Sequence, residues 1–301
     1  MVNHSKIPRS FGTHDGSFHA DEVTACALLL LFDMIDRDKI VRTRDIGELN
    51  LCEYVCDVGG IYDPSRKLFD HHQQDYQGPL SSAGMVLNHL FQTGFLDTRQ
   101  YDFFEYSIIM GVDAHDNGKE LHSKGVCTYS HIISNFNPIN YDEAPKAQDE
   151  AFFEALSFAI DHVARMWRRY LYTHSCQEVV AEAMKNGKTF LLFDRSIPWL
   201  DIFFEMEGAR HPATFVVMPS GQHWKLRGIP PTLEEKMKVR HPLPQEWAGL
   251  SGEDLKKISG IEGAIFCHKG RFISVWETKQ DALKALHQIT SKEIVRNDNG
   301  K

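Results

Sequence analysis

Short apolar runs alternate with helical patterns over the first hundred residues. The runs are typical of buried strands and cover four segments: 7–13, 39–43, 53–58 and 67–70. After the first run, apolar residues recur at helical spacing and fill most sides of a predicted helix over 19–34. A further helix is predicted to begin near Ser81. This order predicts an α/β domain with a mostly parallel sheet and flanking helices.

The pattern changes in the second half of the chain. Residues 98–186 are mainly helical in pattern, and Asn186-Gly187 is a typical end to a helix. Two capping boxes, one at Ser251 and one at Thr278, predict later helices. Among these helices we predict five strands: 188–194, 213–218, 223–228, 263–268 and 271–276. We therefore predict two domains, 1–186 and a smaller α+β domain over 187–301.

The charges and cysteines exclude several classes of protein. Lys and Arg number 33 against 41 Asp and Glu, so the net charge of −8 excludes a wholly basic surface for nucleic acid. The six cysteines form no CxxC pair and indicate a reducing compartment. The longest apolar run, 25–32, is far shorter than the roughly 20 residues of a membrane span. The start has no signal or transit pattern, so we expect a cytoplasmic protein without a membrane partner and leave an organelle or the nucleus open.

Histidine is the abnormal count, with 16 residues, and many of them lie beside carboxylates in four segments: 14–22, 55–60, 69–72 and 111–118. Three of these segments follow predicted strands, whose carboxyl ends form the ligand-binding edge of an open α/β sheet. Imidazoles and carboxylates without thiolates suit Mn²⁺, Mg²⁺, Fe²⁺ or Zn²⁺, with Mn²⁺ the best fit. The candidates exceed the needs of one ion. Two ions about 3.5–4 Å apart, bridged by a carboxylate, would use them and would suit in-line displacement at phosphorus.

Each segment also has a structural interpretation. An Asp before Gly commonly forms a turn or caps a helix, and a His-His pair commonly lies at the surface or packs against neighbours. Only the presence of all four segments in one predicted domain favours a metal site over these explanations.

The motifs of the chain resemble those of a known family. The triplet at 70–72 resembles the signature of the DHH phosphoesterase superfamily, which includes RecJ-type nucleases. The stretches GTHDGSFHADE, DVGGIYDPSRKLFDHHQ, VDAHDNG, RHPLPQEWAGL and SGIEGAIFCHKGRFI resemble the melanocyte-proliferating-gene (Myg-type) family of metal-dependent hydrolases. The resemblance covers about residues 10–290. It implies a DHH-like catalytic domain, a C-terminal cap that binds substrate, and 3′-to-5′ exonuclease activity on RNA.

The resemblance assigns the first metal ligands. His14 matches the first His of the superfamily's opening motif, and Asp21 matches its second Asp. His19 stands where the first Asp would be, and the spacing is one residue longer than the common His-x3-Asp-x-Asp. The His-for-Asp exchange makes the site less negative and leaves the identity of the metal open.

The next two motifs supply a bridge and a phosphate contact. Asp57 matches the bridging Asp, and His71 matches the metal-binding His of the triplet. Asp70 would orient these ligands from behind, and His72 would face the substrate phosphate.

The fourth motif leaves alternatives. Asp113 matches the last metal Asp, but Asp116 competes for that position. His115 is expected to protonate the leaving group, since its ordinary pKa lies near the working pH. Its alternative role is to orient a carboxylate ligand.

Substrate binding is expected from Arg44 in the first domain and from Lys225, Arg227 and Arg240 in the second. Arginine can grip phosphate with two parallel hydrogen bonds. The alternative for each residue is a solvated surface charge, and Arg44 has Asp45 as a structural partner in sequence.

We therefore predict a phosphodiesterase with two divalent ions that acts as a 3′-to-5′ exonuclease on RNA or an oligonucleotide. Two alternatives stay open. One is a small-molecule phosphohydrolase acting on pyrophosphate, an oligonucleotide or a cyclic dinucleotide. The other is a non-catalytic protein that binds a metal or ligand. Homodimerisation is also left open.

Overall fold

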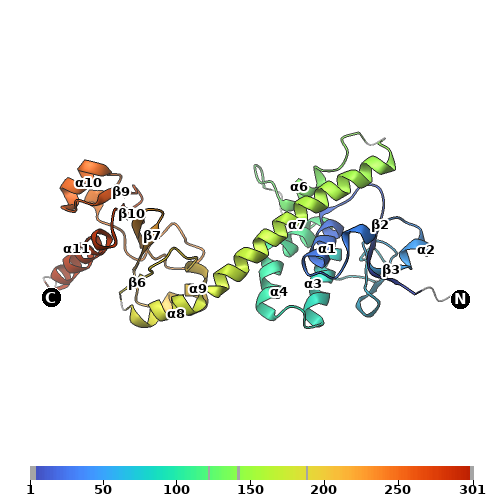
Figure 1. Cartoon of the computed structure of the whole chain (residues 1–301), viewed down its shortest axis with the longest axis horizontal. Coiled ribbons are helices and arrows are strands. Elements are labelled where there is room, and N and C mark those ends of the chain that lie inside the picture. The colour runs from blue at the N-terminus through green and yellow to red at the C-terminus, as the bar shows by residue number, and fades with distance from the viewer. Residues whose placement is uncertain (1–4, 121–122, 141–142, 188, 299–301) are drawn as a thin grey trace. The chain divides into compact units, whose positions relative to one another are not determined.

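The structure is a computed structural model that describes residues 5–120, 123–140, 143–187 and 189–298, with side chains up to 291 (Figure 1). It divides into two compact units, residues 1–168 and 169–301. The division falls inside the helix α7 (Pro145–Ser175), whereas the break predicted at 186 is the end of the next helix, α8 (Gln177–Asn186). A helix without Gly or Pro in its interior gives no sequence signal where one unit passes into the next.

The first unit contains the predicted, mostly parallel sheet. Its strands are β1 (Ile7–Thr13), β2 (Ile40–Arg42), β3 (Cys52–Cys56), β4 (Tyr62–Asp63) and β5 (Leu68–Phe69), in the order β2-β1-β3-β5-β4. All neighbours pair in parallel except β4, which pairs antiparallel with β5. The carboxyl ends of β1, β3 and β5 therefore meet at one edge of the sheet.

Helices pack against this sheet and share a large apolar core with it, and a smaller apolar cluster contains Leu49, Cys52 and Val55. Helix α1 (Ala20–Leu31) buries ten of its twelve residues, which explains why it is apolar on most sides. It packs against α3 (Ser82–Gln92) and α5 (Met110–Asp116). The other helical segments of the unit are α2 (Ile46–Leu49), α4 (Thr98–Phe104), a π-helical turn η3 (Glu105–Ile109), α6 (Tyr129–Ser134), and the 3-10 turns η1 (Arg37–Lys39) and η2 (Pro64–Arg66).

The second unit contains a mixed sheet with a core on each face. Its strands are β6 (Phe190–Leu192), β7 (Phe215–Ser220), β8 (His223–Gly228), β9 (Ala264–Cys267) and β10 (Ile273–Trp276), in the order β6-β7-β8-β10-β9. Phe215 and Val217 join one core with residues of α10 (Gly252–Ser259) and α11 (Lys279–Asp298). Val216 and Met218 join the other, with residues of α8 and α9 (Leu200–Glu205). The α+β interpretation of this region is confirmed; two 3-10 turns, η4 (Gly208–Arg210) and η5 (Gln245–Trp247), complete it.

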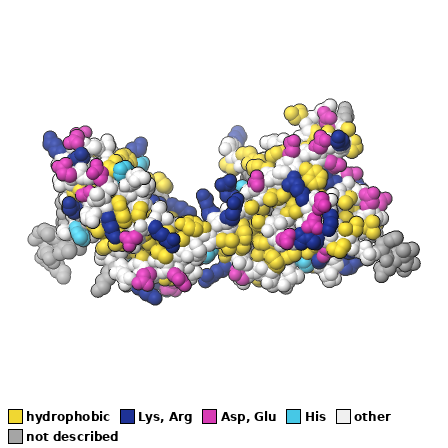
Figure 2. All heavy atoms as spheres, in the orientation of Figure 1, with side chains coloured by type: hydrophobic (Ala, Val, Ile, Leu, Met, Phe, Trp, Pro, Cys, Tyr) yellow, Lys and Arg dark blue, Asp and Glu magenta, His cyan; other side chains and the backbone are white. Residues whose placement is uncertain are grey.

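The face of the molecule drawn in Figure 2 shows no simple division of charge. Figure 2 shows basic and acidic side chains interspersed with hydrophobic ones on the face that it draws. Among the described residues, no helix combines the length and the apolar character needed to cross a membrane. All six cysteines are free thiols.

Candidate metal centre

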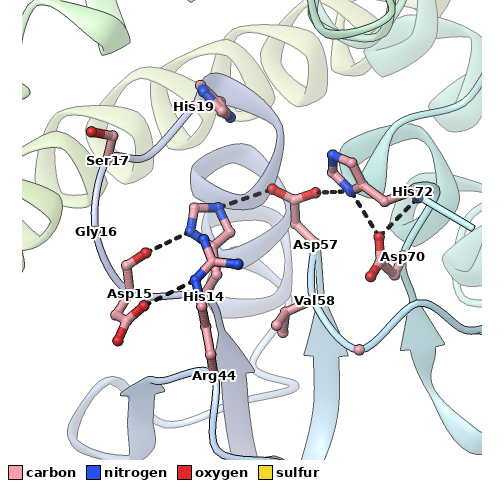
Figure 3. A pocket seen from close by; sticks show the side chains of 11 residues that line it. His14, Asp15, Gly16, Ser17, His19, Arg44, Asp57, Val58, Asp70 and His72 are labelled. Carbon is pink, nitrogen blue, oxygen red and sulfur yellow. Dashed lines mark hydrogen bonds and ion pairs between the residues drawn. The ribbon is translucent and has the colours of Figure 1, made fainter.

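Four ionisable residues follow directly on three neighbouring strands of the first sheet. His14 comes after β1, Asp57 after β3, and Asp70 and His71 after β5. Because the order β1-β3-β5 places these carboxyl ends side by side, residues far apart in sequence meet at one edge. Figure 3 shows this edge.

Asp57 lies at the middle of this group, and its two oxygens face different histidines. Its Oδ2 is 3.1 Å from Nε2 of His14. Its Oδ1 is 3.4 Å from Nε2 of His71 and 3.3 Å from Nδ1 of His72. Figure 3 shows the carboxylate between the rings of His14 and His72. This is the arrangement that a bridging carboxylate requires.

The loop after β3 is shaped to present Asp57. The residue itself has a φ of 58°, a left-handed conformation that Asp and Asn tolerate better than most residues. Three residues later, the N–H of Gly60 donates to Oδ2 of Asp70 at 2.6 Å. The other Asp70 oxygen accepts from the N–H of His72 at 3.0 Å and lies 2.9 Å from its Nδ1. Asp70 therefore holds both the loop and the exposed His72 ring in place.

The first turn of α1 adds a histidine and two buried carboxylates. The N–H of His19 donates to both oxygens of Glu22, at 2.9 and 3.0 Å. Glu22 Oε1 is also 3.2 Å from Nε2 of His14. Asp21 is fully buried, and neither of its oxygens meets a hydrogen-bond donor in the described part of the chain. Its neighbours include other carboxylates, among them Asp57. Two carboxylates attract each other only when a proton or a cation lies between them.

Glu22 has no role in the sequence prediction, although it stands inside the first motif. A Glu three residues after the start of a helix is typical of a capping box, and this one does bond to the N–H of His19. Its second contact, to His14, depends on how α1 meets the end of β1. The sequence carries no signal for that contact.

Helix α5 carries the two competing aspartates, and the structure separates them. Asp116 Oδ2 lies 3.0 Å from Nε2 of His71. Asp113 Oδ1 instead accepts from the N–H and Oγ of Ser81, at 2.9 and 2.6 Å, and from the N–H of Gly84 at 3.2 Å. A Cβ at Gly84 would lie 2.2 Å from Asp113 Oδ2, so a side chain at this position would displace the carboxylate. Asp113 thus binds the N-terminus of α3, and it is Asp116, not Asp113, whose carboxylate contacts His71.

The electrostatics of the group are those of a site that attracts positive charge. Burial opposes ionisation of Asp57, but its contacts with His14 and His71 prevail and lower its pKa. Burial likewise opposes protonation of His14 and His71, yet their acidic partners prevail and raise the pKa of each to about 10. Burial, followed by the charge of Asp57, raises the pKa of Asp21 well above its ordinary value. In the absence of metal, the protons on His14 and His71 therefore balance the negative charge of the carboxylates, as bound cations would.

The donor atoms form three overlapping groups whose members lie within 4.8 Å of one another. The groups are His14, His19, Glu22 and Asp57; Asp57, His71 and His72; and His19, Asp21 and Asp116. Four buried atoms, both oxygens of Asp21, Oδ1 of Asp57 and Nε2 of His71, lack a well-directed hydrogen bond. Buried polar atoms are rarely left so. The all-nitrogen-and-oxygen donor set and these unsatisfied atoms fit divalent cations.

An open pocket of about 650 Å³ adjoins the group. His72, with 63% of its side chain exposed, and Arg44 both line it. Arg44 pairs with Asp15, Nε to Oδ1 at 3.1 Å, while its sequence neighbour Asp45 caps α2 by accepting from the N–H of Glu48. The two groups predicted to contact phosphate in this unit therefore both face the pocket.

His115 does not join this centre. It lies in another group with Glu120 and His131, and its Nδ1 is 2.5 Å from Oε2 of Glu120. Residues 115 and 116 are neighbours on a helix and so point in directions about 100° apart. The predicted role of His115 as the acid for the leaving group has no geometric support.

The three predicted substrate residues of the second unit differ among themselves. Lys225 and Arg227 lie on the same face of β8, half-buried and with no ion-pair partner in the described residues. Burial lowers the pKa of both. Arg240 is different, because its guanidinium donates to four carbonyl oxygens of its own unit: Pro230, His211, Ala213 and Gly208. Four of the five N–H groups of a guanidinium are thus bound within the unit, so the fork that would grip a phosphate is already occupied.

Known proteins resemble the chain over nearly its whole length. The family MYG1_exonuc, described as "Uncharacterised protein family (UPF0160)", matches residues 10–289. The MYG1 protein of Chlamydia muridarum is 49% identical over 290 residues, covering 96% of this chain and 99% of that protein. The MYG1 exonucleases of Rattus norvegicus and Homo sapiens are 32% and 31% identical; they cover 93% and 92% of this chain, and the matches span 84% of each relative.

A solved structure, RecJ from Thermus thermophilus in complex with Mn²⁺, aligns with 92% of this chain and 52% of its own. The TM-score is 0.27 and the identity 11%. The chain spans about half the length of that RecJ. This similarity is too weak to establish a common fold.

Proposed function

Because the chain belongs to the MYG1 exonuclease family, a family of hydrolases, we propose that it is a metal-dependent phosphodiesterase that degrades RNA from the 3′ end. The observation that carries the proposal is Asp57, whose two oxygens face separate histidines next to the unsatisfied carboxylate of Asp21. The triplet Asp70-His71-His72 at the same edge supports a relation to the DHH phosphoesterases.

The ligands divide naturally between two ions. We propose that one ion is held by the group around His14 and that the other is held by His71 and Asp116, with Asp57 shared. The ligands are then His14, His19, Asp21, Glu22, Asp57, His71 and Asp116. Divalent ions bound there would supply the Lewis acidity that hydrolysis of a phosphodiester needs.

Charge balance supports two ions rather than one. The proposed set contains four carboxylates, those of Asp21, Glu22, Asp57 and Asp116, whose combined charge equals that of two divalent cations. Buried charges are tolerated only when they are compensated. Three imidazoles among the ligands favour Mn²⁺ over Mg²⁺, since Mg²⁺ prefers oxygen. We retain Fe²⁺ and Zn²⁺ as alternatives to be tested.

The protein's own groups on the pocket position the substrate. Asp70 holds Nδ1 of His72, so that Nε2 is directed away from it and, when protonated, donates to a phosphoryl oxygen. Arg44 lines the same pocket and offers a second cationic contact. We propose these two residues as the phosphate contacts of the first unit.

The second unit supplies contacts to the RNA backbone. Lys225 and Arg227 alternate with the buried Leu226, so both project from one face of β8. Each is partly desolvated, which costs free energy unless an anion is bound. We propose that they bind phosphates of a polymeric substrate, and we leave Arg240 out of this set.

The test is digestion of end-labelled RNA and DNA oligomers by the full chain, stripped of metal and reloaded with Mn²⁺, Mg²⁺, Fe²⁺ or Zn²⁺. We expect mononucleotides from the 3′ end of RNA with Mn²⁺, and none with the Asp57→Asn variant. Hydrolysis of pyrophosphate or a cyclic dinucleotide without digestion of RNA would identify a small-molecule phosphohydrolase. Bound metal without turnover of any phosphodiester would identify a binding protein.

A further inference from the structure

A second group of metal-ligating side chains lies outside the centre around Asp57. His115 lies in the last turn of α5, Glu120 follows that helix, and His131 lies on α6. One donor atom from each lies within 4.8 Å of the others. Oε2 of Glu120 is 2.5 Å from Nδ1 of His115 and 3.9 Å from Nε2 of His131. None of the three belongs to the groups that share Asp57.

The donor set is specific in its chemistry. Two imidazoles and one glutamate form the protein ligand set of a well-known class of Zn²⁺ site, in which a fourth position stays open. Soft ligands are absent, which disfavours Cu⁺, and two imidazoles disfavour Mg²⁺ and Ca²⁺. All three residues are partly exposed, so an ion can reach them from solvent.

The geometry around His131 supports a metal site over a simple ion pair. Thr128 Oγ1 lies 3.0 Å from Nδ1 of His131, which leaves Nε2 to face Glu120. Ligating histidines are typically oriented by such a bond at the other ring nitrogen. The rings of His115 and His131 lie 5.2 Å apart at 84°. An ion pair between Glu120 and His115 needs only one imidazole, whereas here a second one is directed at the same oxygen.

We propose that His115, Glu120 and His131 bind a divalent cation of the Zn²⁺ type, in addition to the ions of the Asp57 centre. The ion connects the end of α5 to α6 through Glu120. Because His115 precedes Asp116, it also restrains the helical turn that carries Asp116. The proposal does not depend on the proposed nuclease activity, since its ligands are separate.

The first test counts bound zinc in the full chain. Metal-stripped protein is dialysed against buffered Zn²⁺ and its zinc content is measured by mass spectrometry. We expect His131→Ala and the isosteric Glu120→Gln each to bind one equivalent less than wild type. His287→Ala, which removes an exposed histidine of α11, should match wild type. Equal zinc in all four proteins would overturn the proposal, and circular dichroism establishes that each variant is folded.

The second test reads the local effect of the ion and does not involve catalysis. Lys119 and Lys124, both exposed, are trypsin sites on either side of Glu120. A ligand present at 100 times its Kd suppresses local opening by up to about 100-fold. Zn²⁺ should therefore slow cleavage at these lysines in wild type and in Asp57→Asn, but not in His131→Ala. Equal protection in His131→Ala would overturn the proposal even if the nuclease assays succeed.

Discussion

Buried or partly buried charged residues in the two units differ in whether their polar atoms have hydrogen-bond partners. At the edge of the first sheet, Asp21, Asp57 and His71 are brought together with polar atoms left unsatisfied. In the second unit, the guanidinium of Arg240 donates hydrogen bonds to four carbonyl oxygens and lies over the rings of Phe203 and Phe204. A charge whose hydrogen bonds are satisfied can support the fold, while a group of unsatisfied buried atoms is typical of a site that binds a ligand. The partners of a charged residue therefore distinguish its roles better than its type does.

The largest effect is expected from Asp57→Asn. Asn keeps the shape and suits the left-handed backbone, but it removes the charge shared between two ions. Turnover of RNA with Mn²⁺ should fall on the order of 10³-fold or more, the scale of losing one strong electrostatic group. Circular dichroism should be unchanged. Near-normal turnover would show that Asp57 is not a bridging ligand.

Arg240→Ala should destabilise the fold without affecting the chemistry. It leaves four carbonyl oxygens without their donor, which should cost about 3 kcal/mol of unfolding free energy, or more than a hundredfold in the unfolding constant. Denaturant unfolding measures this change, with Arg210→Ala, an exposed arginine, as the control. A stable Arg240→Ala variant with weakened RNA binding would instead restore the substrate role predicted from the sequence.

Asp113→Ala and Asp116→Ala test the contrast within one helix. Asp116→Ala should weaken binding of one metal ion by at least about tenfold, because even partners that only orient a ligand have effects of that size. Asp113→Ala should keep the metals and lose about 1–2 kcal/mol of stability, as expected when a helix N-terminus loses its cap. Calorimetric titration with Mn²⁺ and denaturant unfolding of both variants separate the two roles. If Asp113→Ala instead weakened metal binding and Asp116→Ala reduced only stability, Asp113 would be the metal ligand.

Arg227→Ala should affect polymeric substrates selectively. Loss of one charged contact to phosphate costs about 1.5 kcal/mol, so KM for RNA should rise about tenfold with little change in kcat. KM for a minimal phosphodiester should not change. Steady-state kinetics on both substrates, again with Arg210→Ala as the control, provide the measurement. An equal loss of activity on RNA and on the minimal phosphodiester would mean that the contribution of Arg227 is not specific to polymeric substrates.

A further prediction concerns pH. In the metal-free protein, the pKa of His14 and of His71 is raised to about 10 from an ordinary 6.5. The stability that these charges contribute is therefore complete below pH 6.5 and is lost as the pH rises towards 10. Metal ions replace these protons, so their binding should strengthen with pH over the same range. The difference in Tm between Mn²⁺-loaded and metal-free protein, measured anaerobically, should widen with pH. A constant difference would contradict the assignment of both histidines.

The sequence predicted the parts of the molecule that depend on periodicity. The main strands of both sheets and the buried helix α1 follow from apolar spacing, and the convergence of His14, Asp57 and His71 follows from strand ends. Short elements such as β4, with two residues, carry no period.

The roles that went unpredicted depend on the direction of single side chains. Asp113 and Asp116 are of one type and lie one turn apart, and only their contacts, with the N-terminus of α3 and with His71, distinguish them. The place of His115 depends on Glu120 and His131, which the motif does not contain. Arg240 has partners spread over a distant stretch of the chain. A single sequence shows residue types, but not which neighbours share a side chain's hydrogen bonds.

The close fit of Gly84 and Asp113 has an evolutionary consequence. The carboxylate of Asp113 occupies the space that a Cβ at position 84 would need, at 2.2 Å. A side chain at position 84 would displace this carboxylate from its hydrogen bonds, so we expect a mutation there to be better tolerated after position 113 has changed to a smaller residue. The order of mutations matters, so the two positions form an epistatic pair whose substitutions should appear together among descendants of this lineage.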